Sequence, residues 1–335
     1  MEWDILGHEW AVTLLQQHIQ QEKLQHAYLF TGSPGIGRRT LALKFAQAIN
    51  CSQPPQPGQP CGVCRDCKQL ASMQHPDLSV IQSAEDSASI KVDQIRDLQH
   101  TLSLAPYQGR YRIAMLLNFE DANPNAQNAL LKTLEEAPPR VILFLTSLSP
   151  ENLLPTIASR CEILRLRPLP LQVLETKLIE RWQVEPQKAR LLAHLSSGRL
   201  GDAVHYLQSD ELWERRQMHL DEMGMLLKSN VRDRFSYVEA SAKPGKTTQG
   251  KSDLRFQFET WLSAWRDMLH MQAGSQAPLI NLDWQTELKE LSQEMDILHV
   301  NEQAAALENA LQQLETNQNP RLLTEVLLLN WPRLN

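Results

Sequence analysis

Five short apolar runs, separated by helical patterns, constrain the fold of the first half of this 335-residue chain. Runs of this length, bounded by polar or glycine-rich segments, favour buried strands over helices. They occupy residues 27–30, 78–81, 113–117, 141–145 and 162–166. Between them, apolar residues recur with helical spacing, as in residues 38–49, 92–102 and 124–136. Strands that alternate with helices predict a parallel sheet with helices on both faces, a three-layer α/β domain.

The first apolar run leads into a glycine-rich loop. Its glycines are Gly32, Gly35 and Gly37. Strand, glycine loop and helix form the context of a P-loop, G-x-x-x-x-G-K-[ST], in which backbone N–H groups and Lys hold phosphates and a hydroxyl holds Mg²⁺. Here Arg38 stands at the lysine position, Arg39 stands at the hydroxyl position, and Thr40 comes one residue late. The frame of a nucleotide site is present, but its ion-binding groups are altered.

Four of the five cysteines are clustered with the spacing C-x9-C-x2-C-x2-C: Cys51, Cys61, Cys64 and Cys67. They lie in residues 50–76, where four prolines between residues 54 and 60, together with Gly58, interrupt the alternation and exclude regular structure. Thiolates two residues apart can bind one ion from a tight turn, and four of them complete a tetrahedral Zn²⁺ site. The spacing predicts structural zinc; unligated thiols and a redox pair, which needs only two cysteines, are the alternatives.

The strand pattern stops after residue 170. Residues 170–208 fit a small helical domain, and the following all-α segment has three tryptophans on apolar faces, enough for a core of its own: Trp261, Trp265 and Trp284. A loop at residues 241–250 interrupts that segment. Near it, four basic residues form either a binding patch or a solvated loop: Lys243, Lys246, Lys251 and Arg255. The predicted domains are 1–167 with a zinc-binding insertion at 51–67, 168–208, and 209–335.

Composition limits the location and the partners of the chain. No run approaches the roughly 18 apolar residues of a membrane span, and the N-terminus lacks the basic and apolar regions of a signal peptide. We therefore expect a cytoplasmic protein. The formal net charge of −6 argues against unspecific binding to a polyanion. Any contact with nucleic acid is expected to be local or supplied by partners.

Several segments taken together resemble one family. Besides the glycine loop and the cysteine cluster, they are His75-Pro76-Asp77, residues 128–136 (NALLKTLEE), and residues 154–161, which end in Ser159-Arg160-Cys161. In this order they resemble the clamp-loader branch of the AAA+ ATPases, and within it the bacterial DNA polymerase III delta-prime subunits. The resemblance covers residues 3 to about 203 and returns faintly at 319–322. It implies an AAA+ domain, a helical lid domain and an all-α collar domain for oligomerisation.

The gamma/tau motor subunits of this family share the framework and the zinc cluster but keep intact ATPase motifs. In this chain, the family's acidic pair falls on Leu117 and Asn118; Leu117 cannot assist a metal, and Asn118 cannot accept a proton. We interpret the nearby Glu120 and Asp121 as solvated loop charges. In the lid motif, Asp202 stands where the family has an Arg, and a carboxylate there repels phosphate. The sequence thus predicts no ATP hydrolysis, while inert nucleotide binding stays open.

The motif Ser159-Arg160-Cys161 is intact. In the family, its Arg projects into the ATP site of the neighbouring subunit, where such a finger is worth about 10³–10⁵ in rate in other phosphoryl-transfer systems. A surface salt-bridge arginine is the alternative for Arg160. Cys161 is expected to be a small buried residue beside it. Thr146 matches the family's sensor position, with a strand-end cap as the alternative.

The leading hypothesis is a catalytically silent AAA+ subunit of a sliding-clamp loader. The resemblance implies gamma/tau motor subunits and the delta subunit as partners, with the sliding clamp and primed DNA reached through a hetero-pentamer. One alternative is an active ATPase, either a gamma/tau-like motor or a divergent AAA+ enzyme. A scaffold outside replication that kept the fold is the other.

Overall fold

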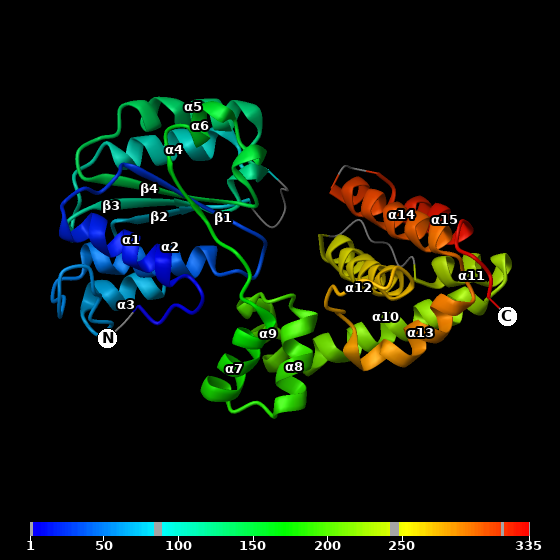
Figure 1. Ribbon diagram of the computed structural model, residues 1–335. Helices are drawn as coiled ribbons and strands as arrows, with labels where there is room; N and C mark the ends of the chain where they lie inside the picture. The colour runs from blue at the N-terminus through cyan, green and yellow to red at the C-terminus, as the bar shows by residue number, and fades with distance from the viewer. Residues whose placement is uncertain (1–2, 84–88, 242–247, 316–317, 335) are drawn as a thin grey trace. The chain divides into compact units, whose positions relative to one another are not determined.

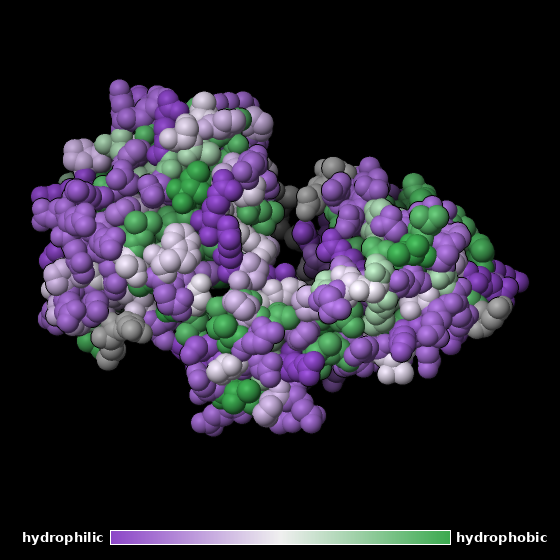
Figure 2. Space-filling model, viewed as in Figure 1, coloured by the Kyte–Doolittle hydropathy of each residue, from purple (hydrophilic) through white to green (hydrophobic). Residues whose placement is uncertain are grey.

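The computed structural model describes residues 3–83, 89–241, 248–315 and 318–334. The chain divides into two compact units, Met1–Leu169 and Pro170–Asn335; the first is α/β and the second is all-helical (Figure 1). The segments predicted as lid and collar both fall in the second unit, apart from residues 168–169. Figure 2 shows a mostly hydrophilic face with small apolar patches. None of the helices in the described ranges has the length and hydropathy needed to cross a lipid bilayer.

All five predicted strands are present and form one parallel sheet in the order β2-β3-β4-β1-β5. The strands are β1 (Ala27–Thr31), β2 (Leu78–Ile81), β3 (Arg112–Leu116), β4 (Val141–Ser147) and β5 (Glu162–Arg165). The three central strands, β3, β4 and β1, are buried along their whole length. Helices cover both faces of such a sheet, which is why its strands have continuous apolar runs in the sequence.

Two separate cores lie on the two faces of this sheet, because successive strand side chains point in opposite directions. On one face, Tyr28 and Phe30 of β1 pack with Phe45 and Phe144, with ring centroids 4.9–6.0 Å apart. On the other face, Leu29 joins a second cluster. The first face is covered by α1 (Glu9–Gln20), α2 (Arg38–Asn50) and α3 (Arg65–Ala71), and the second by α4 (Val92–Leu102), α5 (Pro124–Glu135) and α6 (Pro155–Ala158) (Figure 1).

Helix α3 corrects the expectation that residues 50–76 lack regular structure. The four prolines end at Pro60, before the helix begins. Cys64 caps the helix N-terminus, since its sulfur accepts a hydrogen bond from the backbone N–H of Cys67 at 3.4 Å. A capping residue with a proline-free segment after it is a helix-start signal, but a cysteine cap lies outside the usual set of Ser, Thr, Asp and Asn.

The second unit consists of helices in its described residues. They are α7 (Leu171–Trp182), α8 (Pro186–Leu195), α9 (Leu200–Gln208), α10 (Asp210–Lys228), α11 (Val231–Ser241), α12 (Thr248–Gln272), α13 (Gln285–Gln293), α14 (Ile297–Glu315) and α15 (Pro320–Leu329). His194 of α8 lies 2.5 Å from the carbonyl oxygen of Leu279, between α12 and α13. The helices of the predicted lid therefore pack on the rest of this unit.

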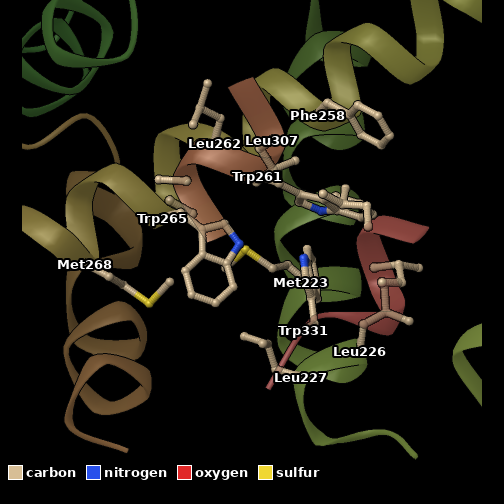
Figure 3. Close-up of a cluster of buried hydrophobic side chains, with 14 of the residues drawn as sticks. Met223, Leu226, Leu227, Phe258, Trp261, Leu262, Trp265, Met268, Leu307 and Trp331 are labelled. Atoms are coloured by element: carbon tan, nitrogen blue, oxygen red, sulfur yellow. The ribbon is translucent and has the colours of Figure 1, made fainter. Parts of the chain in front are cut away.

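A tryptophan cluster forms the centre of the second unit (Figure 3). Trp261 and Trp265 of α12 are fully buried, as predicted. Trp284 is only partly buried at the edge of the cluster, and Trp331, near the end of the chain, completes it instead. The ring of Trp331 lies 4.9 Å from that of Trp261 and 5.8 Å from that of Trp265. Trp331 and Leu334 are therefore both part of this core.

Candidate functional site

The glycine loop connects β1 to α2 at the carboxyl edge of the sheet. Gly32 has φ of 145°, and a Cβ atom there would lie 2.9 Å from the carbonyl oxygen of Leu166. Its N–H group lies within hydrogen-bonding distance of the carbonyl oxygens of Ser147 and Leu148, at 3.2 and 3.1 Å. Only glycine fits this close approach without strain. The loop is thus held tightly between the ends of β4 and β5.

Arg38, the first residue of α2, is bound to groups at the same edge. Its Nη2 donates a hydrogen bond to Asn118 Oδ1 at 3.1 Å, and its Nη1 lies 3.9 Å from Glu120 Oε1. The Arg38 side chain is only 10% exposed. Burial lowers the pKa of Arg38, although the carboxylates of Glu120 and Asp121 oppose this shift. The lysine position of the P-loop pattern therefore carries a cation already engaged by its own chain.

Asn118 connects this contact to β4. It adopts a left-handed backbone conformation, with φ of 47°, directly after the buried Leu117. Its backbone N–H donates to Thr146 Oγ1 at 2.8 Å. The structure thus brings together three of the predicted positions: Arg38 from α2, Asn118 from the turn after β3, and Thr146 from β4. None of the three supplies a carboxylate for Mg²⁺.

Glu120 is not the solvated loop charge that we expected. It lies in the short 3₁₀ helix Phe119–Asp121, and its side chain is 13% exposed. Its Oε1 accepts a hydrogen bond from the backbone N–H of Leu148 at 3.1 Å. Asp121 accepts a hydrogen bond from Ser83 Oγ at 3.4 Å. These carboxylates link the strand-end loops to one another.

The other two altered positions of the loop are exposed. Arg39 Nη2 contacts Met73 Sδ at 3.0 Å, near the end of α3, and not the atoms around Asn118. Thr40 is exposed in the first turn of α2.

Asp202, at the lid-motif position where the family has an Arg, lies in the second unit. Its Oδ2 forms an ion pair with the Nε of Arg199 at 2.5 Å.

Arg160 follows α6 on the surface of the first unit. Its Nη1 donates to the carbonyl oxygen of Thr156 at 2.9 Å, and its Nη2 forms an ion pair with Glu135 Oε1 at 2.8 Å. Ser159 Oγ donates to the same carbonyl oxygen at 3.2 Å. Cys161 is only partly buried, where a buried residue was expected, and it packs beside the α5 core. Burial raises the pKa of its thiol to about 12.

Arg160 and the glycine loop lie at opposite ends of the strands: Arg160 is at their amino ends and the glycine loop is at their carboxyl ends. Arg160 precedes β5, whose first residue, Glu162, pairs with Tyr28 near the start of β1. Gly32 follows the end of β1, four residues beyond Tyr28. At about 3.3 Å per strand residue, the two ends are about 13 Å apart along the strand direction. Arg160 is therefore placed away from the glycine loop of its own chain.

The four clustered cysteines converge on one point. All four sulfurs lie within 4.8 Å of one another, and the Cys51–Cys64 and Cys61–Cys67 sulfurs are each 4.0 Å apart. Tetrahedral zinc with Zn–S bonds of about 2.3 Å needs sulfurs about 3.8 Å apart. Backbone N–H groups of Cys61 and Cys64 donate to the sulfurs of Cys51 and Cys61, both at 3.3 Å. The cluster can hold a metal ion without rearrangement of the backbone.

The thiols differ in their ease of ionisation. Burial alone would raise the pKa of Cys64, but hydrogen bonds from the backbone N–H of Cys67 and from Ser52 outweigh it and lower this pKa to about 6. Burial raises the pKa of Cys51 and of Cys67. A bound cation would favour the thiolate at each position.

Hydrogen bonds and ion pairs that we did not predict from the sequence hold the segment that follows the cysteine cluster. His75 Nε2 lies 3.3 Å from Asp66 Oδ1 within α3. The buried carboxylate of Asp77 accepts hydrogen bonds from three successive backbone N–H groups, those of residues 107–109, at 2.7–2.8 Å. It also pairs with Arg112 at 3.2 Å. The segment His75-Pro76-Asp77 was visible as a motif, but its partners are remote in sequence.

The fold and the site define an AAA+-like α/β protein with a degenerate P-loop and a helical C-terminal half. A family model described as "DNA polymerase III, delta subunit" matches residues 7–170, and one described as "DNA polymerase III, delta subunit, C terminal" matches residues 210–333. DNA polymerase III subunit delta′ of Bacillus subtilis (strain 168) is 32% identical over 319 residues, covering 95% of this chain and 94% of that protein. The chain belongs to the DNA polymerase III delta′ subunit family.

Other similarities are more distant or partial. DNA polymerase III subunit tau of the same organism is 27% identical and covers 96% of this chain, but this chain spans only 60% of that protein. A DNA polymerase III gamma subunit-related protein from Thermotoga maritima has a crystal structure that matches with a TM-score of 0.54 at 16% identity, covering 95% of this chain and 97% of that one. This last likeness concerns the fold alone.

Proposed function

We propose that this chain is a clamp-loader subunit of bacterial DNA polymerase III that does not hydrolyse ATP and supplies Arg160 to ATP bound by a neighbouring motor subunit. The observation that carries the proposal is the hydrogen bond between Arg38 and Asn118. These residues stand where an active site has its phosphate-binding lysine and its catalytic carboxylate. With Leu117 and Asn118 in place of the acidic pair, the site lacks the two carboxylates that would hold Mg²⁺ and orient the attacking water.

The position of Arg160 supports action on a neighbouring subunit. Its side chain is 35% exposed, so a partner can reach it. Arg160 lies at the amino ends of the strands and Gly32 at their carboxyl ends, which argues against action of Arg160 on its own glycine loop. A guanidinium presents five N–H donors in a fixed fork, which suits the oxygens of a phosphoryl group.

The cysteine cluster supports a structural role for zinc. Four thiolates fill a tetrahedral shell and leave no position for water or substrate. Cys51 ends α2 and Cys64 caps α3, so one ion would tie together two helices on the same face of the sheet. The zinc would stabilise the insertion and take no part in phosphoryl transfer.

The family supports the remaining assignments. We propose gamma/tau motor subunits and a delta subunit as direct partners, with the sliding clamp and primed DNA reached through the assembled hetero-pentamer in the cytoplasm. Residues 168–208 would serve as the lid and residues 209–335 as the collar. Of the proposed basic patch, Lys243 and Lys246 lie outside the described residues, while Arg255 of α12 pairs with Glu259 at 2.9 Å. That pair favours the interpretation of Arg255 as a solvated side chain.

The direct test replaces Arg160 in a reconstituted complex. Arg160→Ala is expected to leave assembly intact and to abolish the contribution of the neighbouring site to clamp- and DNA-stimulated ATP turnover, a loss of about 10³-fold or more at that site. Arg165→Ala is the matched control, because Arg165 is an exposed arginine on β5 that pairs with Glu151. Unchanged turnover in the Arg160→Ala complex would refute the finger role.

Similarity to tau over most of the chain favours an active ATPase as the second candidate. Turnover by the purified chain separates the two. We expect no Mg²⁺-dependent hydrolysis above background. Hydrolysis that disappears in an Arg38→Ala variant would establish the second candidate and exclude the first.

A further inference from the structure

Arg160 is held by a carboxylate of its own chain, and this contact bears on its use as a finger. We propose that Glu135 is a positioning residue that retains Arg160 in the unassembled subunit and yields it to the phosphate oxygens of a neighbour's nucleotide. This inference rests on the proposed function, because it concerns how the finger is held and released.

Both terminal nitrogens of the Arg160 guanidinium have a partner. Nη2 lies 2.8 Å from Glu135 Oε1, and Nη1 donates to the carbonyl oxygen of Thr156 at 2.9 Å. A phosphoryl group that binds through both terminal nitrogens therefore competes with Glu135 for Nη2. Glu135 makes no contact with a neighbour's nucleotide in this scheme and acts only through Arg160.

The backbone on either side of the pair is fixed, so release is a side-chain motion. Glu135 is the last residue of α5, and Leu134 before it is 1% exposed. Arg160 lies one turn beyond Ile157 of α6, which is fully buried in the same cluster. Rotation of the Arg160 side chain is enough to exchange one anion for another.

The strength of the ion pair sets the size of the effect. The two side chains are 35% and 52% exposed, so solvent screens their attraction. An exposed pair of this kind biases a side chain about 1.4- to 5-fold toward its partner. Glu135 thus reduces the population of free Arg160 modestly, and a polyphosphate with several charges competes successfully with it.

The test uses Glu135→Gln in the reconstituted complex, with Glu136→Gln as control. Glu136 is the next residue and is also exposed, but it has no ion pair within the described ranges. At subsaturating ATP, Glu135→Gln is expected to raise turnover by about 1.4- to 5-fold, in proportion to the released population. Glu136→Gln is expected to match the wild type. In an Arg160→Ala background, Glu135→Gln should have no further effect.

A second measurement needs no partner. Side-chain NMR of labelled arginine in the isolated full chain should show slower guanidinium rotation for Arg160 in the wild type than in Glu135→Gln. Equal mobility in both, or turnover that is unchanged or reduced by Glu135→Gln, would overturn the retention by Glu135. Failure of the finger role itself would be seen separately, because the Arg160→Ala complex would then have wild-type turnover.

Discussion

Replacement of Arg234 is expected to destabilise the second unit strongly, because this buried cation has only backbone carbonyls as partners among the described residues. Arg234 in α11 is 3% exposed. Burial lowers the pKa of Arg234, and the nearby Arg333 acts in the same direction. Its guanidinium donates to five carbonyl oxygens at the ends of α10 and α15, at 2.6–3.4 Å, those of Leu226, Leu227, Leu328, Trp331 and Pro332.

The cost follows from which carbonyls would lose their last donor. The carbonyl oxygens of Leu226, Leu227 and Leu328 also accept backbone hydrogen bonds. Those of Trp331 and Pro332 have no other donor in the described part of the chain. Each orphaned buried carbonyl costs about 1–3 kcal/mol, and removal of a buried charge returns part of this sum. We expect Arg234→Met, which keeps the aliphatic stem, to lower the free energy of unfolding by about 3 kcal/mol.

Equilibrium unfolding of the full chain in urea, followed by tryptophan fluorescence, measures this change. The midpoint temperature of thermal unfolding of this unit should fall by about 6–12 °C. Arg234→Lys should recover only part of the loss, since one ammonium group cannot bridge both helix ends. Arg232→Met is the control: Arg232 is exposed on the same helix and should change stability by less than about 0.5 kcal/mol. A similarly small effect of Arg234→Met would refute the reasoning.

Three further predictions concern the first unit, and one of them has its control in α10 of the second unit. Metal analysis of the purified chain should find about one zinc ion per chain; Cys64→Ser should lose it and Cys161→Ser should keep it. Gly32→Ala should cost about 1–3 kcal/mol, because its Cβ would lie 2.9 Å from a backbone oxygen at φ of 145°. Gly224→Ala, in open space within α10, should instead stabilise by about 0.5–1 kcal/mol, and equal changes in thermal unfolding would contradict this contrast. Burial would raise the pKa of Asp77, but three backbone N–H donors and Arg112 lower it, so its stabilisation is complete at neutral pH and lost as pH falls below the ordinary carboxyl range. Asp77→Asn should accordingly increase hydrogen exchange at residues 107–109 already at neutral pH.

Local patterns predicted the elements more reliably than their surroundings. The five apolar runs correctly predicted the strands, because a strand buried on both faces needs apolar residues at every position. Helix α3 was missed, since its cap is a cysteine and the prolines before it suggested an irregular segment. Trp284 was predicted for the core and lies at its edge, whereas Trp331 near the end of the chain fills the centre. Helical periodicity places a residue on a face of its own helix, but it does not say which remote segment covers that face.

The sequence by itself determined the α/β order, the convergence of four cysteines within one short segment, and the absence of the P-loop lysine, hydroxyl and acidic pair. These features depend on residue type and on short spacing along the chain. Tertiary structure alone decided that Arg38 bonds to Asn118, that the Glu120 side chain is only 13% exposed, and that Glu135 pairs with Arg160. Each of these features depends on groups from separate elements that the fold brings together. Their contacts therefore depend on sheet order and helix packing, which residue type and spacing do not specify.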